Sequence, residues 1–160
     1  MEHVAHLADR PPLRVLSKRV SIGIESIGQT LDQAFDEAYS IIDATKTETA
    51  GPPFVIYHSM PEAGRPMDIE ICAPIAGTLE SSDPWRVAEL PAGTFASQKH
   101  VGPYDAVEAT YIALTEWIPQ HGLAIAGPPR EVYLSEPTVP PELTETIVEF
   151  PVMRVPVAVG

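Results

Sequence analysis

The residues of this chain that are best suited to chemistry lie in the stretch 130–135, which reads Arg-Glu-Val-Tyr-Leu-Ser. An acid here interrupts an otherwise apolar strand pattern. Because alternate side chains of a β-strand share a face, Glu131, Tyr133 and Ser135 point to the same side. A carboxylate beside a phenol can hold a cation, or it can act as a general base towards a bound water. The stretch therefore predicts a binding site or a catalytic site.

The surroundings of Glu131 decide between these uses and a structural one. A carboxylate enclosed by tyrosine and aliphatic side chains loses hydration free energy unless it finds a partner. A cationic ligand would restore that loss, and aromatic rings would add about 0.5–2 kcal/mol of cation–π attraction. The alternative is that Glu131 lies on the surface of an edge strand or pairs with a nearby arginine.

The elements that must position Glu131 read as two copies of one pattern. Pro-Pro-Phe-Val-Ile-Tyr at residues 52–57 matches Pro-Pro-Arg-Glu-Val-Tyr at residues 128–133. When the two tyrosines are aligned, Val55 stands where Glu131 stands. A duplicated scaffold with an acid in one copy and a valine in the other indicates a functional difference between the copies.

Each copy follows the order strand–helix–strand–strand. Ser26 and Gln29 have capping-box spacing, and the apolar residues from Ile27 to Ile42 recur at helical spacing. A second helix is expected from Gly102–Pro103 to a stop at Gly122. Alternating and β-branched residues predict strands at 13–24, 54–58, 68–74, 87–90, 93–100, 130–135 and 144–152.

This pattern predicts an α+β fold in which the duplicated units form an antiparallel sheet with two helices on one face. The expected organisation is a flexible N-terminal arm over residues 1–11 and one domain over residues 12–160, with pseudo-repeats at about 12–77 and 85–155. We expect a central ligand cleft on the face opposite the helices. Glu131 and Tyr133 are expected to line it, with Tyr57 facing Tyr133.

Aromatic residues are the other candidates for the site. Tyr57 and Tyr133 could stack on a ligand or bond the carboxylate, or they could be ordinary core residues. Trp117 could form a wall of the cleft or belong to the core, and Tyr104 lies on the apolar stripe of the second helix, as core or cleft rim. Trp85 follows Asp-Pro in a loop, where it could cap the cleft or anchor the loop.

Composition excludes several classes of function for this 160-residue chain. A net charge of −12 with scattered Lys and Arg argues against nucleic-acid binding. Cys72 is the sole cysteine, so it cannot form an internal disulfide, and we expect it to be a small buried residue. The histidines lack metal-ligand spacing, and neither a nucleophile elbow nor a phosphate-binding loop is present. We expect no metal, no cofactor, no membrane span and a cytoplasmic protein.

The ordered motifs resemble the GyrI-like family, also known as the AraC-type or bacterial transcription factor effector-binding domain. The residues that carry the resemblance are 99–105, 114–118, 121–123, 130–135 and 146–152, and more weakly 73–75. The resemblance implies a duplicated fold with a central cleft that binds small, often aromatic and cationic molecules. It also implies a glutamate at the base of that cleft, which maps onto Glu131. The chain resembles a stand-alone member without a helix-turn-helix.

Three functions therefore stand as hypotheses. The first is a binding domain for hydrophobic, cationic or polyaromatic molecules, with Glu131 as counter-charge. The second, which the resemblance implies, is a hydrolase of cyclopropane-bearing compounds, with Glu131 as general base and Tyr133 as its partner. The third is a protein-binding inhibitor, such as one that acts on DNA gyrase. The natural ligand, the oligomeric state and any separate transcription regulator stay open.

Overall fold

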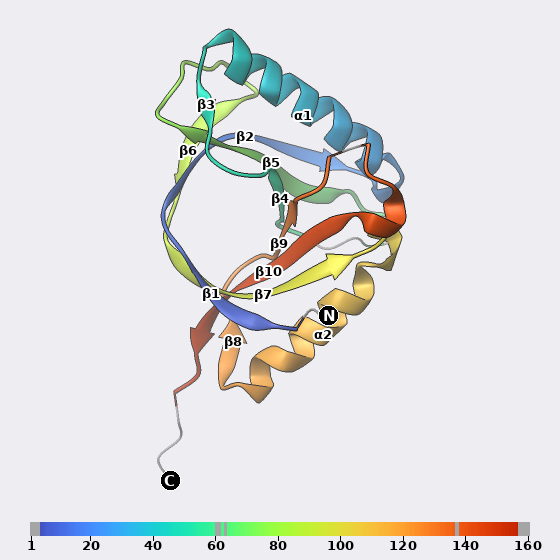
Figure 1. Cartoon of the computed structure of the whole chain (residues 1–160). Coiled ribbons are helices and arrows are strands. Elements are labelled where there is room, and N and C mark those ends of the chain that lie inside the picture. The colour runs from blue at the N-terminus through green and yellow to red at the C-terminus, as the bar shows by residue number, and fades with distance from the viewer. Residues whose placement is uncertain (1–3, 60–61, 63, 137, 157–160) are drawn as a thin grey trace. The chain divides into compact units, whose positions relative to one another are not determined.

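The computed structural model describes residues 4–59, 62, 64–136 and 138–156 (Figure 1). The chain divides into two compact units. We call Pro11–Ala92 the N-terminal unit, and Met1–Arg10 together with Gly93–Gly160 the C-terminal unit.

The N-terminal unit is an antiparallel sheet in the order β4-β5-β2-β6, with the short β3 paired to β5. Its long helix packs against β5 and β2. Leu16, Ile69 and Ile71 are fully buried in its core. The elements in chain order are β2 (Leu13–Ile22), η1 (Ile24–Ser26), α1 (Ile27–Ala44), β3 (Glu48–Thr49), β4 (Phe54–Tyr57), β5 (Met67–Ala76) and β6 (Arg86–Leu90).

The C-terminal unit repeats this plan in the order β1-β7-β10-β9, with the short β8 paired to β10. Leu114 and Ile118 of its helix pack in one apolar cluster with Ala96, Val148 and Phe150 of the sheet. The elements are β1 (His6–Arg10), β7 (Gly93–Val101), η2 (Tyr104–Ala106), α2 (Glu108–Gln120), β8 (Leu123–Ile125), β9 (Arg130–Tyr133), η3 (Pro141–Leu143) and β10 (Glu145–Arg154).

The predicted α+β duplication is confirmed, because both units contain the series strand–helix–strand–strand. The expected loose arm over residues 1–11 is wrong in its described part. His6–Arg10 form β1, which pairs along its whole length with β7. Each unit receives one edge strand from the segment that precedes the other unit in the chain. β1, which comes before β2, pairs with β7 in the C-terminal unit. β6, which comes before β7, pairs with β2 in the N-terminal unit.

The helices follow their sequence patterns in the middle and depart from them at the start. Ser26 precedes α1 without a side-chain capping bond, so the predicted capping box is absent. Residues 104–106 form a 3₁₀ turn, and α2 begins only at Glu108. Gly122 ends α2 as predicted, with φ of 70°, a left-handed conformation that glycine adopts without strain. None of the described helices is long and apolar enough to span a membrane.

Candidate functional site

Glu131 lies on the face of the C-terminal sheet that α2 covers. It pairs across the strands with Val148 of β10, and Val148 belongs to the apolar cluster on which Leu114 and Ile118 of α2 pack. Paired residues of an antiparallel sheet share a face. The prediction that Glu131 lies opposite the helix is therefore wrong. Alternation shows which side chains share a face, but helix packing decides which face is covered.

The carboxylate of Glu131 is buried and accepts hydrogen bonds from two tyrosines. Its residue exposure is 8%. The Tyr111 hydroxyl on α2 donates to Oε2 over 2.6 Å, and the Tyr133 hydroxyl donates to Oε1 over 3.3 Å. The first distance is typical of a strong hydrogen bond to a charged acceptor. Phenol hydroxyls from the helix and from its own strand thus both donate to this buried side chain.

Further aromatic rings surround this carboxylate. The rings of Tyr104 and Tyr133 make an edge contact with centroids 5.7 Å apart, and Tyr104 is 50% exposed. Tyr111 makes a second edge contact with Phe150 at 5.9 Å. The aromatic group therefore extends from the buried Glu131 to the protein surface at Tyr104.

The corresponding positions of the N-terminal unit are apolar. In α1 the buried residues Ala34, Ala38 and Ile42 recur at the same spacing as the buried residues of α2. This alignment puts Phe35 in the place of Tyr111, just as Val55 takes the place of Glu131. Acid and phenol are thus exchanged together for valine and phenylalanine.

Sequence reasoning did not single out Tyr111 as the partner of Glu131. The available signal was the change from Phe35 to Tyr111 at matching helix positions, coupled to the change from Val55 to Glu131. A comparison of the two helices, made as the two strands were compared, would have found it.

A second buried acid lies on the opposite face of the same sheet. Glu149 of β10 is 1% exposed. Arg10 donates to it over 3.1 Å, and Arg130 lies 3.6 Å from its other oxygen and 4.1 Å from the ring of Phe95. Arg10 belongs to the edge strand β1, so this cluster fastens β1 to the sheet across β7.

The remaining predicted site residues lie elsewhere. Tyr57 is buried in the N-terminal unit, in β4. Trp117 packs against the apolar core near the end of α2 and stacks on His121 with centroids 4.0 Å apart. Trp85 is 2% exposed, donates its indole N–H to Glu37 and lies beside Lys18. These contacts anchor the loop that precedes β6. Hydrogen bonds and ring contacts bring together Glu131, Tyr133 and Tyr104, and add Tyr111.

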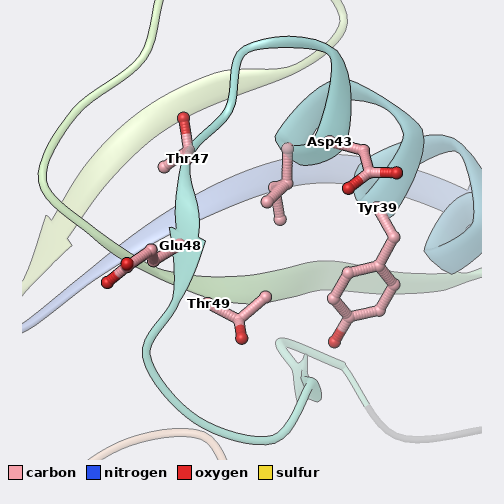
Figure 2. Close-up of a pocket in the computed structure, with 6 residues that line it drawn as sticks. Tyr39, Asp43, Thr47, Glu48 and Thr49 are labelled. Carbon is pink, nitrogen blue, oxygen red and sulfur yellow. The ribbon is translucent and has the colours of Figure 1, made fainter.

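A hollow of about 580 Å³ lies in the N-terminal unit between the end of α1 and β3 (Figure 2). Burial raises the pKa of the Tyr39 phenol at its wall. Its two acids, Asp43 and Glu48, are exposed to solvent and so remain hydrated, unlike Glu131. The hollow contains none of the predicted site residues. Its lining residues are Tyr39, Ile42, Asp43, Thr47, Glu48 and Thr49.

The described residues were compared with the side-chain groups that a metal site requires. Within residues 4–59, 62, 64–136 and 138–156, no group of three or more His, Cys, Asp or Glu side chains could hold a metal ion. Cys72 is buried, as predicted.

The sequence model of the GyrI-like small molecule binding domain matches residues 6–153. This chain belongs to the GyrI-like family. The match runs from β1 to β10 and therefore includes both units. The chain is a small-molecule binding domain related to the effector-binding domains of transcription regulators.

The chain is similar to a DNA gyrase inhibitor and to the C-terminal domain of a longer protein, EcmrR. A DNA gyrase inhibitor of Erwinia billingiae (strain Eb661) is 29% identical over 121 residues, which cover 67% of this chain and 72% of that protein. The C-terminal domain of EcmrR is 25% identical, with a TM-score of 0.85 over 97% of this chain and 100% of that domain. In the EcmrR–DNA complex in EcmrR-RPo, the match has a TM-score of 0.84 and 25% identity and covers 96% of this chain, which spans 58% of the EcmrR chain.

SAV2435, whose structure was determined bound to tetraphenylphosphonium, has the same fold. It is 17% identical, with a TM-score of 0.58 over 96% of this chain and 94% of its own.

Proposed function

We propose that this GyrI-like domain binds hydrophobic cations, with Glu131 as the counter-charge. The observation that carries the proposal is the buried carboxylate of Glu131, which is held by the hydroxyl of Tyr111 over 2.6 Å. The same positions of the other unit hold Val55 and Phe35. A fold that is stable with an apolar pair at these positions does not need the acid for its architecture.

The free energy of the buried charge supports a cationic ligand. A carboxylate in an apolar interior is costly, because burial removes its hydration. A ligand cation in contact with Glu131 would offset part of that cost. Tyr133 and Tyr104 would present ring faces to it, and cation–π attraction adds about 0.5–2 kcal/mol for each well-placed ring.

Binding requires the site to open. Because Glu131 is 8% exposed and Tyr111 donates to it, a ligand must displace the Tyr111 hydroxyl before it reaches the carboxylate. The half-exposed Tyr104 marks the side from which the aromatic group meets solvent. Tetraphenylphosphonium, the ligand of SAV2435, is a cation with an apolar surface and so belongs to the class that this chemistry selects.

The test compares a charged and a neutral aromatic ligand of similar size. Isothermal titration calorimetry would measure the affinities of tetraphenylphosphonium and of triphenylphosphine oxide for the wild type and for Glu131→Gln. The control is Glu116→Gln, which removes the same charge from an exposed position of α2. We expect the wild type and the control to prefer the cation, and Glu131→Gln to lose that preference.

Two outcomes would count against the proposal. Equal affinity for the charged and neutral ligands in the wild type would mean that Glu131 is not a counter-charge. If Glu131→Gln kept the same preference for the cation, the cation would have to bind at a place other than Glu131 on β9. Thermal unfolding of each variant would establish that the altered proteins are folded.

Inhibition of DNA gyrase is a second candidate function, favoured by the 29% identical relative named for that activity. The test is a supercoiling assay with purified gyrase and increasing amounts of this domain. Loss of supercoiling at stoichiometric amounts would support this function. Full activity at a large excess of the domain would exclude it.

A further inference from the structure

The interior under α2 is polar at more positions than Glu131 and Tyr111. In the C-terminal unit, His100, Thr146 and Tyr133 lie opposite one another across β7, β10 and β9. The matching row of the N-terminal unit across β2, β5 and β4 is Val20, Ile69 and Tyr57.

The helix that covers this row is also more polar in the C-terminal unit than in the N-terminal unit. Thr110 of α2 occupies the place of Ala34 of α1, as the buried residues of the two helices show. His100, Thr110 and Thr146 are 9%, 6% and 0% exposed, so all three are buried polar residues. Together with Glu131 and Tyr111, five interior positions are polar in one unit and apolar in the other.

Two of these polar residues, His100 and Thr110, are hydrogen-bonded to each other. The Nε2 atom of His100 donates to the carbonyl oxygen of Pro103 over 2.9 Å, because a carbonyl can only accept. A second hydrogen bond of 3.3 Å joins Nδ1 to the Thr110 hydroxyl. These bonds hold the turn before α2.

Thr146 is different. Its hydroxyl is fully buried and has no hydrogen-bond partner among the residues that the structure describes. A buried hydroxyl without a partner is destabilising relative to a methyl group of the same shape, and native proteins rarely retain one without a use. Thr146 is next to Tyr133 in register, and Tyr133 is two residues from Glu131 on the same strand face. The Cα atoms of diagonal neighbours of this kind lie about 7–8 Å apart.

We propose that the ligand of this site carries a hydroxyl or a comparable hydrogen-bonding group about 7–8 Å from its cationic centre, and that Thr146 binds that group. The inference rests on the proposed function, because a ligand can reach the buried Thr146 only when the site at Glu131 opens. Glu131 then selects for charge, and Thr146 selects among cations by the position of their hydroxyl group. The ligand class is hydroxylated aromatic amines and quaternary ammonium compounds.

The test uses three matched cations: trimethyl(2-phenylethyl)ammonium and its para- and ortho-hydroxylated forms. In an extended conformation the para hydroxyl lies at about the required distance from the nitrogen, whereas the ortho hydroxyl lies much closer. Calorimetry would measure all three with the wild type, Thr146→Val and Thr146→Ser. We expect the wild type and Thr146→Ser to bind the para form roughly three to ten times more tightly than the unsubstituted cation.

Thr146→Val should lose this preference and keep its affinity for the unsubstituted cation. It should also unfold at a higher temperature than the wild type in the absence of ligand, because it removes a buried unpaired hydroxyl. A para preference that survives in Thr146→Val would overturn the inference, as would its absence from a wild type that still binds the unsubstituted cation. Failure of all three cations to bind would refute the proposed function as well.

Discussion

Replacing Tyr111 with phenylalanine should lower the stability of the free domain and tighten its binding of cations. The change removes one hydroxyl that donates to Glu131 over 2.6 Å. A hydrogen bond to a charged group contributes about 1.5–3 kcal/mol to stability. The ring itself is retained, so its edge contact with Phe150 persists. Phe35 shows that phenylalanine fits the matching position of the other unit.

The two effects have opposite signs because the bond exists only in the ligand-free state. The free domain loses about 1.5–3 kcal/mol, which corresponds to a fall of about 3–12 °C in Tm for a chain of this size. A cation that must displace Tyr111 from Glu131 no longer has to break that bond. Its affinity should rise about tenfold or more, since every 1.4 kcal/mol changes an affinity by about a factor of ten.

Differential scanning calorimetry and titration with tetraphenylphosphonium would measure the two quantities on the same protein. Tyr133→Phe removes a longer bond of 3.3 Å, so it should change both quantities in the same directions by smaller amounts. Tyr39→Phe, on α1, is the control and should leave cation binding unchanged. If Tyr111→Phe weakens cation binding in proportion to its loss of stability, the hydroxyl contacts the ligand, and displacement is refuted.

Other predictions concern ionised groups away from the site. Glu149→Ala should lower the free energy of unfolding by about 3–5 kcal/mol in urea titrations, because it leaves Arg10 and Arg130 without their buried partner; a loss under about 1 kcal/mol would mean that water compensates both arginines. The hydrogen bond from Arg19 lowers the pKa of Asp68, so this pair adds stability above the ordinary carboxyl pKa of 3.8 and loses it as the pH falls through the lowered value. Asp68→Asn should therefore flatten the acid side of a stability–pH profile, by a small amount because both side chains are about half exposed; a profile identical to that of the wild type would contradict the assignment.

The long elements of the fold were predictable from sequence because their signals are local. The apolar stripe of α1, the glycine after α2 and the alternating patterns of β2, β5, β7 and β10 each fall within one segment. Short strands were not predictable. β3 and β8 contain two and three residues, too few for any period, and β1 is a strand because β7 offers it an edge.

The residues of the candidate site also fall into those that the sequence could predict and those that it could not. Glu131 and Tyr133 were found from alternation and from the comparison of two strands. Tyr111 and Thr146 were not, because hydrogen bonds between a helix and a strand, and the lack of one in a buried position, depend on how the elements pack.

The order of residues is enough to show that the chain is a duplicated α+β protein and that Val55 in one copy is matched by Glu131 in the other. These conclusions need only periodicity and alignment, which are properties of the chain. The packing of the elements was needed to show that α2 covers the face of Glu131, that Tyr111 donates to it, and that Glu149 is buried with arginines on the opposite face. A strand pattern is the same whichever of its faces a helix covers, so the packing of α2 determines which acid becomes the buried partner of a tyrosine.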